Sequence, residues 1–181
     1  MSDISNELII QAADGDMAAF EAIYKASSGF VYNIALKVTN NRDDADEVTQ
    51  DVFVKIFNSL KSFGFRSSFK TWIYRIAANT AINHAKSAFR HRRSKVEYDP
   101  VIHDVQAPDT TKLEPDTEEV KDTVARLLDA LDPDQRAVLV LRELEELDYR
   151  AIADTLNINI NTVRSRLKRA REKLIALARK R

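Results

Sequence analysis

Residues 149–171 read YRAIADTLNININTVRSRLKRAR, and this stretch has the spacing of two helices joined by a tight turn. Asn157 falls where the first helix should end in the left-handed conformation, which asparagine tolerates better than most residues. Asn161 is expected to cap the second helix by accepting hydrogen bonds from its free amides. The stretch therefore predicts a helix-turn-helix with helices over 149–156 and 161–178.

The second helix of this motif has two opposite faces. At about 100° per residue, one stripe is apolar and holds Val163, Leu167, Ala170 and Leu174. The opposite face is polar and basic, and its base-reading candidates are Arg164, Ser165, Lys168 and Arg169. Arg166 and Arg171 lie nearer the apolar side, so they are expected to contact phosphate or to cover the apolar stripe. The alternative is a basic helix that faces only solvent.

The charges of the chain are arranged in blocks, although 28 basic and 28 acidic residues give no net charge. Residues 61–93 carry eight basic side chains and no acidic one, and residues 160–181 carry nine basic side chains and one acidic. Residues 1–60 are predominantly acidic. Two basic segments, each beside an acidic one, predict two DNA-facing surfaces.

Residues 94–119 are predicted to be a linker. Three of the four prolines, Pro100, Pro108 and Pro115, fall in this range, where helical periodicity also disappears. Eight acidic side chains accumulate there against two basic ones. The linker is expected to be flexible and acidic.

The linker divides the chain into two small domains, residues 1–93 and 120–181, each within the size range that folds alone. Apolar residues recur at spacings of three and four in both, and glycine is rare, so we expect an all-α protein. Asp132, Pro133 and Gln135 are expected to start a helix with a capping box. The other helices are expected near residues 5–14, 16–38, from 43, from about 68, and near 118–131.

No cofactor, metal ion or catalytic site is expected. The chain has no cysteine, its histidines (His84, His91 and His103) lack the spacing of a ligand pair, and it has no phosphate-cradling glycine loop. No segment reaches the roughly 18 apolar residues of a membrane span, and the N-terminus is polar and acidic. We therefore expect a cytoplasmic protein that is not an enzyme and does not insert into membranes.

An aromatic loop and a polar helix face mark the first basic segment. The loop comprises Phe63, Gly64, Phe65, Arg66, Ser67 and Ser68. Exposed rings in such a loop can stack on or enclose an unpaired base. The helix that follows repeats basic and amide side chains on one face, at Arg75, Asn79, Asn83, Lys86 and Arg90. Such a face suits a nucleic-acid backbone with selective base contacts. The alternatives are core aromatics in the loop and a solvated face on the helix.

The helix expected from residue 43 has an acidic outer face. Its outward side chains include Asp46, Glu47, Gln50 and Asp51. DNA would repel this face, so we expect it to meet a protein, with a plain solvated surface as the alternative.

Four stretches form a recognisable series. They read DMAAF at 16–20, DADEVTQDVF at 44–53, FKTWIYRIA at 69–77, and residues 131–174 including TVRSRL at 162–167. In this order they resemble the extracytoplasmic-function (group IV) sigma factors of bacterial RNA polymerase, over nearly the whole chain. Asn157 and Asn161 stand where the family often has glycine around the turn, and the family often has glycine near Phe65.

The resemblance implies a different function for each of the two domains. Residues 1–93 would bind core RNA polymerase and melt and read the minus-ten promoter element, and residues 120–181 would read the minus-thirty-five element. Asp46, Glu47, Gln50 and Asp51 would dock on the polymerase clamp helices, with the polymerase flap as a further contact. The loop Phe63–Ser68 would hold a flipped base of the melted strand, with Asn79 as a second reader. The duplex-reading set would include Thr162 and Arg166, and an anti-sigma factor would be an additional partner.

The rival hypothesis is a free-standing helix-turn-helix repressor or activator that binds DNA without polymerase. That hypothesis leaves the aromatic loop, the acidic helix face and the acidic linker without a role.

Overall fold

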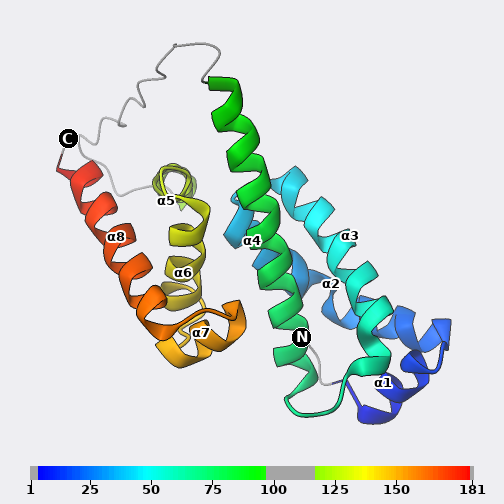
Figure 1. Cartoon of the computed structure of the whole chain (residues 1–181). Coiled ribbons are helices and arrows are strands. Elements are labelled where there is room, and N and C mark those ends of the chain that lie inside the picture. The colour runs from blue at the N-terminus through cyan, green and yellow to red at the C-terminus, as the bar shows by residue number, and fades with distance from the viewer. Residues whose placement is uncertain (1–3, 97–116, 180–181) are drawn as a thin grey trace. The chain divides into compact units, whose positions relative to one another are not determined.

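The computed structural model describes residues 4–96 and 117–179, and in these ranges it consists of helices joined by short loops (Figure 1). They contain eight α-helices, one short 3-10 turn and no strand, which confirms the all-α prediction. Within the described residues, no helix has the length and apolar character needed to cross a membrane.

The chain divides into two compact units, Met1–His84 and Ala85–Arg181. The division falls before the expected boundary at residue 93, and that domain boundary stays a prediction. Most of the expected linker lies outside the described residues. Helical residues occupy both ends of the expected range 94–119, since one helix ends at Val96 and the next begins at Thr117.

The N-terminal unit is formed by α1 (Asn6–Ala13), α2 (Met17–Thr39), α3 (Arg42–Ser59), the 3-10 turn η1 (Leu60–Ser62) and the first part of α4 (Phe69–Val96). Side chains cap the first three helices: Ser5 accepts from the Leu8 amide, Asp16 from Ala18 and Ala19, and Asn41 from Asp44. Asn40 ends α2 in the left-handed conformation, with φ of 57°. The break expected between the helices near 16–38 and from 43 is therefore confirmed, and the chain reverses there so that α3 packs along α2.

The core of the N-terminal unit fixes which face of each helix is exposed. Ile23 of α2, Ile56 of α3 and Ile73 of α4 are completely buried. Tyr74 of α4 lies against Phe30 of α2, with ring centroids 6.2 Å apart. α4 also buries several small side chains, which let a helix approach its neighbours closely: Ala77, Ala78 and Ala81.

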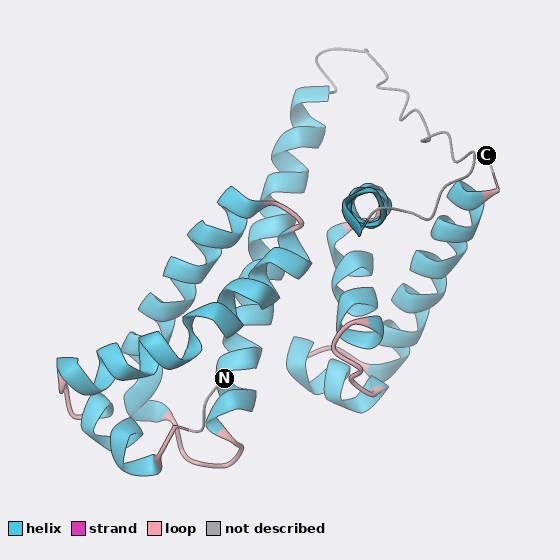
Figure 2. Ribbon diagram, turned by 180° about the vertical axis from the view of Figure 1, so that it is seen from behind, coloured by secondary structure: helices cyan, strands magenta, loops and turns pink. Residues whose placement is uncertain are grey.

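The C-terminal unit contains α5 (Thr117–Asp129), α6 (Pro133–Glu143), α7 (Tyr149–Leu156) and α8 (Ile160–Ala178) (Figure 2). Asp132 caps α6 by accepting from the Asp134 amide, and Pro133 occupies its first turn, as expected. The expected capping box is wrong, because the buried Gln135 Oε1 accepts no hydrogen bond.

The helix-turn-helix is formed by α7 and α8, which pack on each other through Ile152, Val163 and Leu167. Asn157 is left-handed, with φ of 51°, as predicted. The predicted cap at Asn161 is wrong, because α8 begins one residue earlier and its cap is Asn159. Asn159 has the extended backbone that a capping residue needs, and its side chain accepts from the Asn161 amide at 2.8 Å.

Candidate nucleic-acid interface

The loop between η1 and α4 is built on a buried ring. Phe63 is only 8% exposed, and its ring lies 4.7 Å from that of Phe65, 5.2 Å from that of Phe69 and 5.1 Å from that of Trp72, measured between centroids. The expectation that both loop phenylalanines are exposed is therefore wrong for Phe63. Its ring joins the core because three neighbouring aromatic side chains surround it.

Phe65 is the exposed ring of the loop. Its side chain is 46% exposed, and its backbone is left-handed, with φ of 54°. A bulky residue is unfavourable in that conformation, so the contact with Phe63 helps to hold it there. Gly64, Arg66 and Ser68 are exposed beside it, and Ser67 is half-buried. The Ser68 hydroxyl accepts from the Thr71 amide at 3.1 Å, which fixes the point where the loop enters α4.

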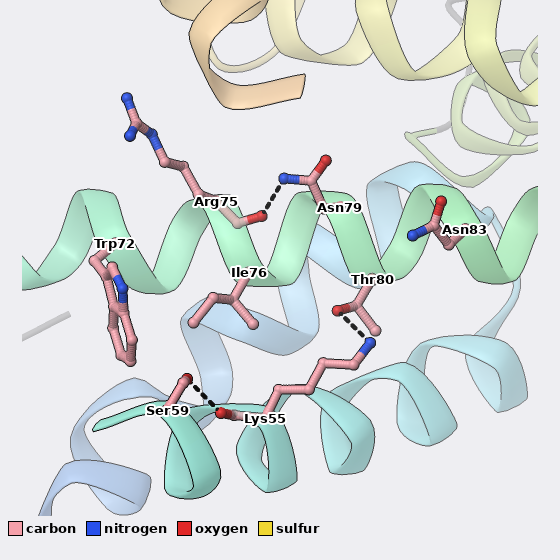
Figure 3. A pocket seen from close by; sticks show the side chains of 8 residues that line it. All are labelled: Lys55, Ser59, Trp72, Arg75, Ile76, Asn79, Thr80 and Asn83. Atoms are coloured by element: carbon pink, nitrogen blue, oxygen red, sulfur yellow. Dashed lines mark hydrogen bonds between the residues drawn. The ribbon is translucent and has the colours of Figure 1, made fainter. Parts of the chain in front are cut away.

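An open groove of about 410 Å³ lies between α3 and α4, the two helices that precede and follow this loop (Figure 3). Figure 3 shows Trp72, Ile76 and Thr80 pointing from α4 toward α3, where Lys55 and Ser59 form the opposite wall. The other lining residues are Arg75, Asn79 and Asn83. The structure thus brings together three of the five polar residues that the sequence predicted along this helix face, and Trp72 and Ile76 form half-buried walls of the groove.

Hydrogen bonds hold two polar groups of the groove in place. Lys55 Nζ donates to the hydroxyl of Thr80, which is 5% exposed, at 3.0 Å. Asn79 Nδ2 donates to the backbone carbonyl of Arg75 at 2.9 Å. A fixed ammonium group, a fixed amide and the flat wall of an indole ring together suit an unstacked base with its phosphate.

Lys55, Ser59 and Thr80 were missed by sequence reasoning. Apart from Arg42 in the first turn, Lys55 is the one basic residue of the acidic helix α3, and it lies at the end away from Asp43 and Asp44. That isolated charge was the only signal available, because the partner Thr80 lies 25 residues away in sequence.

The second candidate surface is the polar face of α8. Arg164, Ser165, Lys168 and Arg169 are exposed, while Val163, Leu167 and Ala170 on the opposite stripe are buried. The predicted two-faced helix is therefore confirmed. Lys168 lies 3.8 Å from Glu172, and both side chains are mostly exposed, so this ion pair restrains Lys168 only weakly.

Two arginines of α8 are bound to acidic residues of α6. Arg166 Nη1 lies 3.2 Å from Asp134 Oδ1, and Arg171 Nη2 donates to Glu143 Oε1 at 2.6 Å. The hydrogen bond to Glu143 raises the pKa of the Arg171 guanidinium above its ordinary value. These contacts tie α8 to α6, and they place Arg166 and Arg171 at the scaffold side of the helix, as their sequence positions indicated.

Arg164 has a different partner. Its Nη1 donates to Asn161 Oδ1 at 2.8 Å, one turn earlier on the same helix. In the same turn, the Ser165 hydroxyl donates to the carbonyl of Thr162 at 3.0 Å. The base-reading candidates nearest the start of α8 are therefore bonded within the helix itself.

A third surface, on α3, combines acidic and apolar side chains. Asp46, Glu47, Gln50 and Asp51 are exposed, as predicted. On the same helix Val54 is 60% exposed and Phe57 is 46% exposed. The Phe57 ring meets that of Phe20 on α2 edge-on, with centroids 5.1 Å apart. Sequence reasoning missed this extension because apolar residues on a helix are first assigned to the core.

An apolar cleft of about 390 Å³ lies within the C-terminal unit, between α5, α6 and α8. Val124 and Leu144 at its edges are 45% and 49% exposed. The other lining side chains are Leu127, Leu128, Leu139, Val140, Glu143, Arg171 and Leu174. Exposed apolar side chains grouped in this way are typical of a protein-docking site.

No group of three or more metal-ligating side chains occurs among the residues that the structure describes.

Two family models match the chain. "Sigma-70 region 2" matches residues 23–91, which include the loop and the groove, and "Sigma-70, region 4" matches residues 121–174, which include the helix-turn-helix. The RNA polymerase sigma-H factor of Pseudomonas aeruginosa is 31% identical to this chain over 175 residues, which cover 92% of this chain and 89% of that protein.

The chain belongs to the extracytoplasmic-function sigma factor family.

Other members of the family show the same relationship. The ECF RNA polymerase sigma-E factor of Haemophilus influenzae is 33% identical, with 91% of this chain and 90% of that protein covered. The solved structure of CnrH in complex with the cytosolic domain of CnrY is 26% identical, covers 97% of both chains and has a TM-score of 0.62. The fold also matches the sigma factor RpoE of Bartonella quintana, solved with the anti-sigma factor NepR, at 22% identity, a TM-score of 0.60, and coverage of 88% and 96%. The chain is thus an alternative sigma factor, a transcription initiation factor that directs core RNA polymerase to promoters.

Truncation of the two phenylalanines of the loop should change stability by very different amounts. Phe63→Ala should lower the free energy of unfolding of the N-terminal unit by about 3–5 kcal/mol, because it leaves a cavity under the loop. Phe65→Gly should change it by less than about 1 kcal/mol, because glycine relieves the left-handed backbone while the ring contact is lost. Urea unfolding followed through Trp72, the single tryptophan of the chain, measures both. Equal losses of stability in the two variants would show that Phe65 is part of the core.

Proposed function

We propose that the loop Phe63–Ser68 and the groove between α3 and α4 together capture an unpaired base of the melted minus-ten element. The exposed Phe65 ring supplies a stacking surface, and the buried Phe63 holds the loop in place. Arg66 and Arg75 are exposed cations that suit the phosphates on either side. Gly64, Ser67 and Ser68 give the loop its shape.

The groove is proposed to contact the adjacent nucleotide. Asn79 and Asn83 carry amides, which pair with base edges, and Lys55 carries the positive charge that a phosphate requires. The observation that supports this assignment is the Lys55–Thr80 hydrogen bond, because it holds a cation at the mouth of a groove walled by Trp72.

The exposed face of α8 is proposed to read the minus-thirty-five element as duplex DNA. An α-helix fits the major groove, and its base readers here are Arg164, Ser165, Lys168 and Arg169. Thr162, at the start of the helix, is assigned a phosphate contact. Arg166 is assigned only a supporting contact with a DNA phosphate, because its guanidinium is already paired with Asp134.

Core RNA polymerase is proposed to contact both units. The three acidic side chains Asp46, Glu47 and Asp51 and the amide of Gln50, extended by Val54 and Phe57, form a surface for the clamp helices. An acidic rim beside apolar side chains suits a partner helix with apolar and basic faces. The apolar cleft of the C-terminal unit is assigned to the polymerase flap.

An anti-sigma factor is proposed as the regulatory partner. The matched structures of CnrH and of Bartonella quintana RpoE are complexes, the latter with a named anti-sigma factor. A protein that covers the α3 surface or the apolar cleft of this chain would compete directly with polymerase for them.

The chain is proposed to act in the cytoplasm, where polymerase and promoter DNA meet, and to perform no catalysis of its own. Its candidate surfaces carry cations, amides, carboxylates and apolar groups that bind and orient partners. The phosphoryl-transfer chemistry of RNA synthesis is left to polymerase.

Arg164→Ala and Lys168→Ala should each reduce the preference for the native minus-thirty-five sequence by about fivefold to a hundredfold, the range of one specific base contact. Binding of the chain to core polymerase should stay unchanged. Arg179→Ala, which removes the same charge after the last turn of α8, is the matched control. In vitro transcription from promoters with single substitutions measures the preference, and wild-type selectivity in both variants would refute the base-reading assignment.

Asp51→Arg should weaken binding to core polymerase by about tenfold or more, because it reverses a charge within the proposed docking surface. Phe57→Ala should weaken the same interaction through lost apolar contact. Asp154→Arg, an equal charge reversal on the exposed side of α7, should bind core polymerase like the wild type. Competition against a labelled sigma factor measures the affinities. Wild-type affinity of the Asp51 variant would exclude it from the docking surface.

A further inference from the structure

We propose that Asn161 is a positioning residue that orients Arg164 for sequence-specific reading of the minus-thirty-five element. The inference rests on the proposed function of Arg164 as a base reader and adds a residue that determines how well it reads. Its chemical basis is the side-chain hydrogen bond between the two residues, from Arg164 Nη1 to Asn161 Oδ1 at 2.8 Å.

The backbone of α8 explains why the Asn161 side chain is available for this bond. Asn159 caps the helix, and it does so by accepting from the Asn161 main-chain amide at 2.8 Å. The side chain of Asn161 is therefore released from capping. It lies three residues before Arg164, a spacing at which two side chains share one face of a helix.

A restraint of this kind lowers the entropic cost at which an exposed arginine reads a base. Its side chain has many rotamers, and immobilising it on DNA costs conformational entropy. Arg166 and Arg171 are restrained by carboxylates of α6, but those contacts hold them at the scaffold side of the helix. Arg164 is restrained on the exposed side, where a guanidinium fork would face guanine.

The chemistry of the partner matters as much as its position. A carboxylate beside Arg164 would offset its charge and repel the phosphates of DNA. The amide oxygen of Asn161 is neutral, so it fixes one N–H group of the guanidinium and leaves its positive charge intact. The remaining N–H groups stay available for a bidentate contact.

Asn161 is also close enough to the start of α8 to touch DNA itself, and asparagine pairs with adenine through its amide. Direct reading and positioning differ in one measurable respect. A direct reader acts without Arg164, whereas a positioning residue acts only through it. A double-mutant cycle separates the two roles.

The test uses the full chain assembled with core polymerase and transcribing a library with a randomised minus-thirty-five element. The variants are Asn161→Ala, Arg164→Ala, the double variant and Asn161→Asp. Alanine is a better helix former than asparagine, so Asn161→Ala should keep α8 folded, and thermal unfolding checks this.

We expect Asn161→Ala to reduce discrimination by about threefold to tenfold, the effect of one hydrogen bond, and only at the position that Arg164 reads. In the Arg164→Ala background the same change should have no further effect. Asn161→Asp keeps the acceptor oxygen, so it should retain discrimination while lowering activity on every library member through repulsion of phosphate.

Three results would overturn the inference. They are wild-type discrimination by Asn161→Ala, an undiminished effect of that change when Arg164 is already absent, or loss of discrimination in Asn161→Asp. If Arg164→Ala itself keeps full discrimination, the base-reading function of Arg164 fails instead, and the two failures are distinguishable.

Discussion

The burial of one face of every helix is the constraint on which the surfaces of this protein depend. In the N-terminal unit, Ile23, Ile56 and Ile73 lock α2, α3 and α4 together with no exposed area. A helix whose apolar stripe is fixed cannot rotate, so its polar stripe is fixed as well. The same packing therefore turns the acidic residues of α3 outward and places Lys55 opposite Thr80 of α4, in one groove with Asn79 and Asn83.

In the C-terminal unit, ion pairs as well as apolar contacts fix the orientation of a helix. The buried residues Val163 and Leu167 set the rotation of α8, and the ion pairs of Arg166 and Arg171 with α6 reinforce it. Two of the four arginines of this helix therefore stabilise its packing against α6. The surface left for DNA is narrower than the basic composition alone indicates, and Arg164 at its start is held by a neutral amide.

Much of this arrangement could be predicted from sequence because it is local. Helical periodicity, the cap at Asp132 and the left-handed Asn157 each depend on a few neighbouring residues, and each was correct. The cap of α8 was misplaced because Asn159 and Asn161 are chemically equal, and only the backbone conformation decides between them. Phe63 was misassigned because periodicity ends where a loop begins, and its burial depends on three-dimensional contacts with Phe69 and Trp72.

Only the polar α4 residues of the groove could be predicted, for the same reason. Arg75, Asn79 and Asn83 form a pattern along one helix, whereas Lys55 belongs to the site through contact with another helix. Non-local pairs of this kind leave no periodic signal in a single sequence. The acidic, proline-containing stretch 94–119 predicted the two domains, and the family resemblance added a function for each. The matches to the two sigma regions, residues 23–91 and 121–174, fall on either side of that stretch.

We propose that the chain directs polymerase to promoters by reading two DNA elements at once. Run-off transcription by core polymerase and the full chain, on templates that vary each element and the spacing between them, tests it most directly. A sigma factor that reads both elements should give a transcript from one defined start, and this transcript should be lost when the spacing changes by half a helical turn, about five base pairs. Specific binding of the chain to DNA without polymerase, together with no specific transcript when polymerase is added, would instead identify a free-standing DNA-binding regulator.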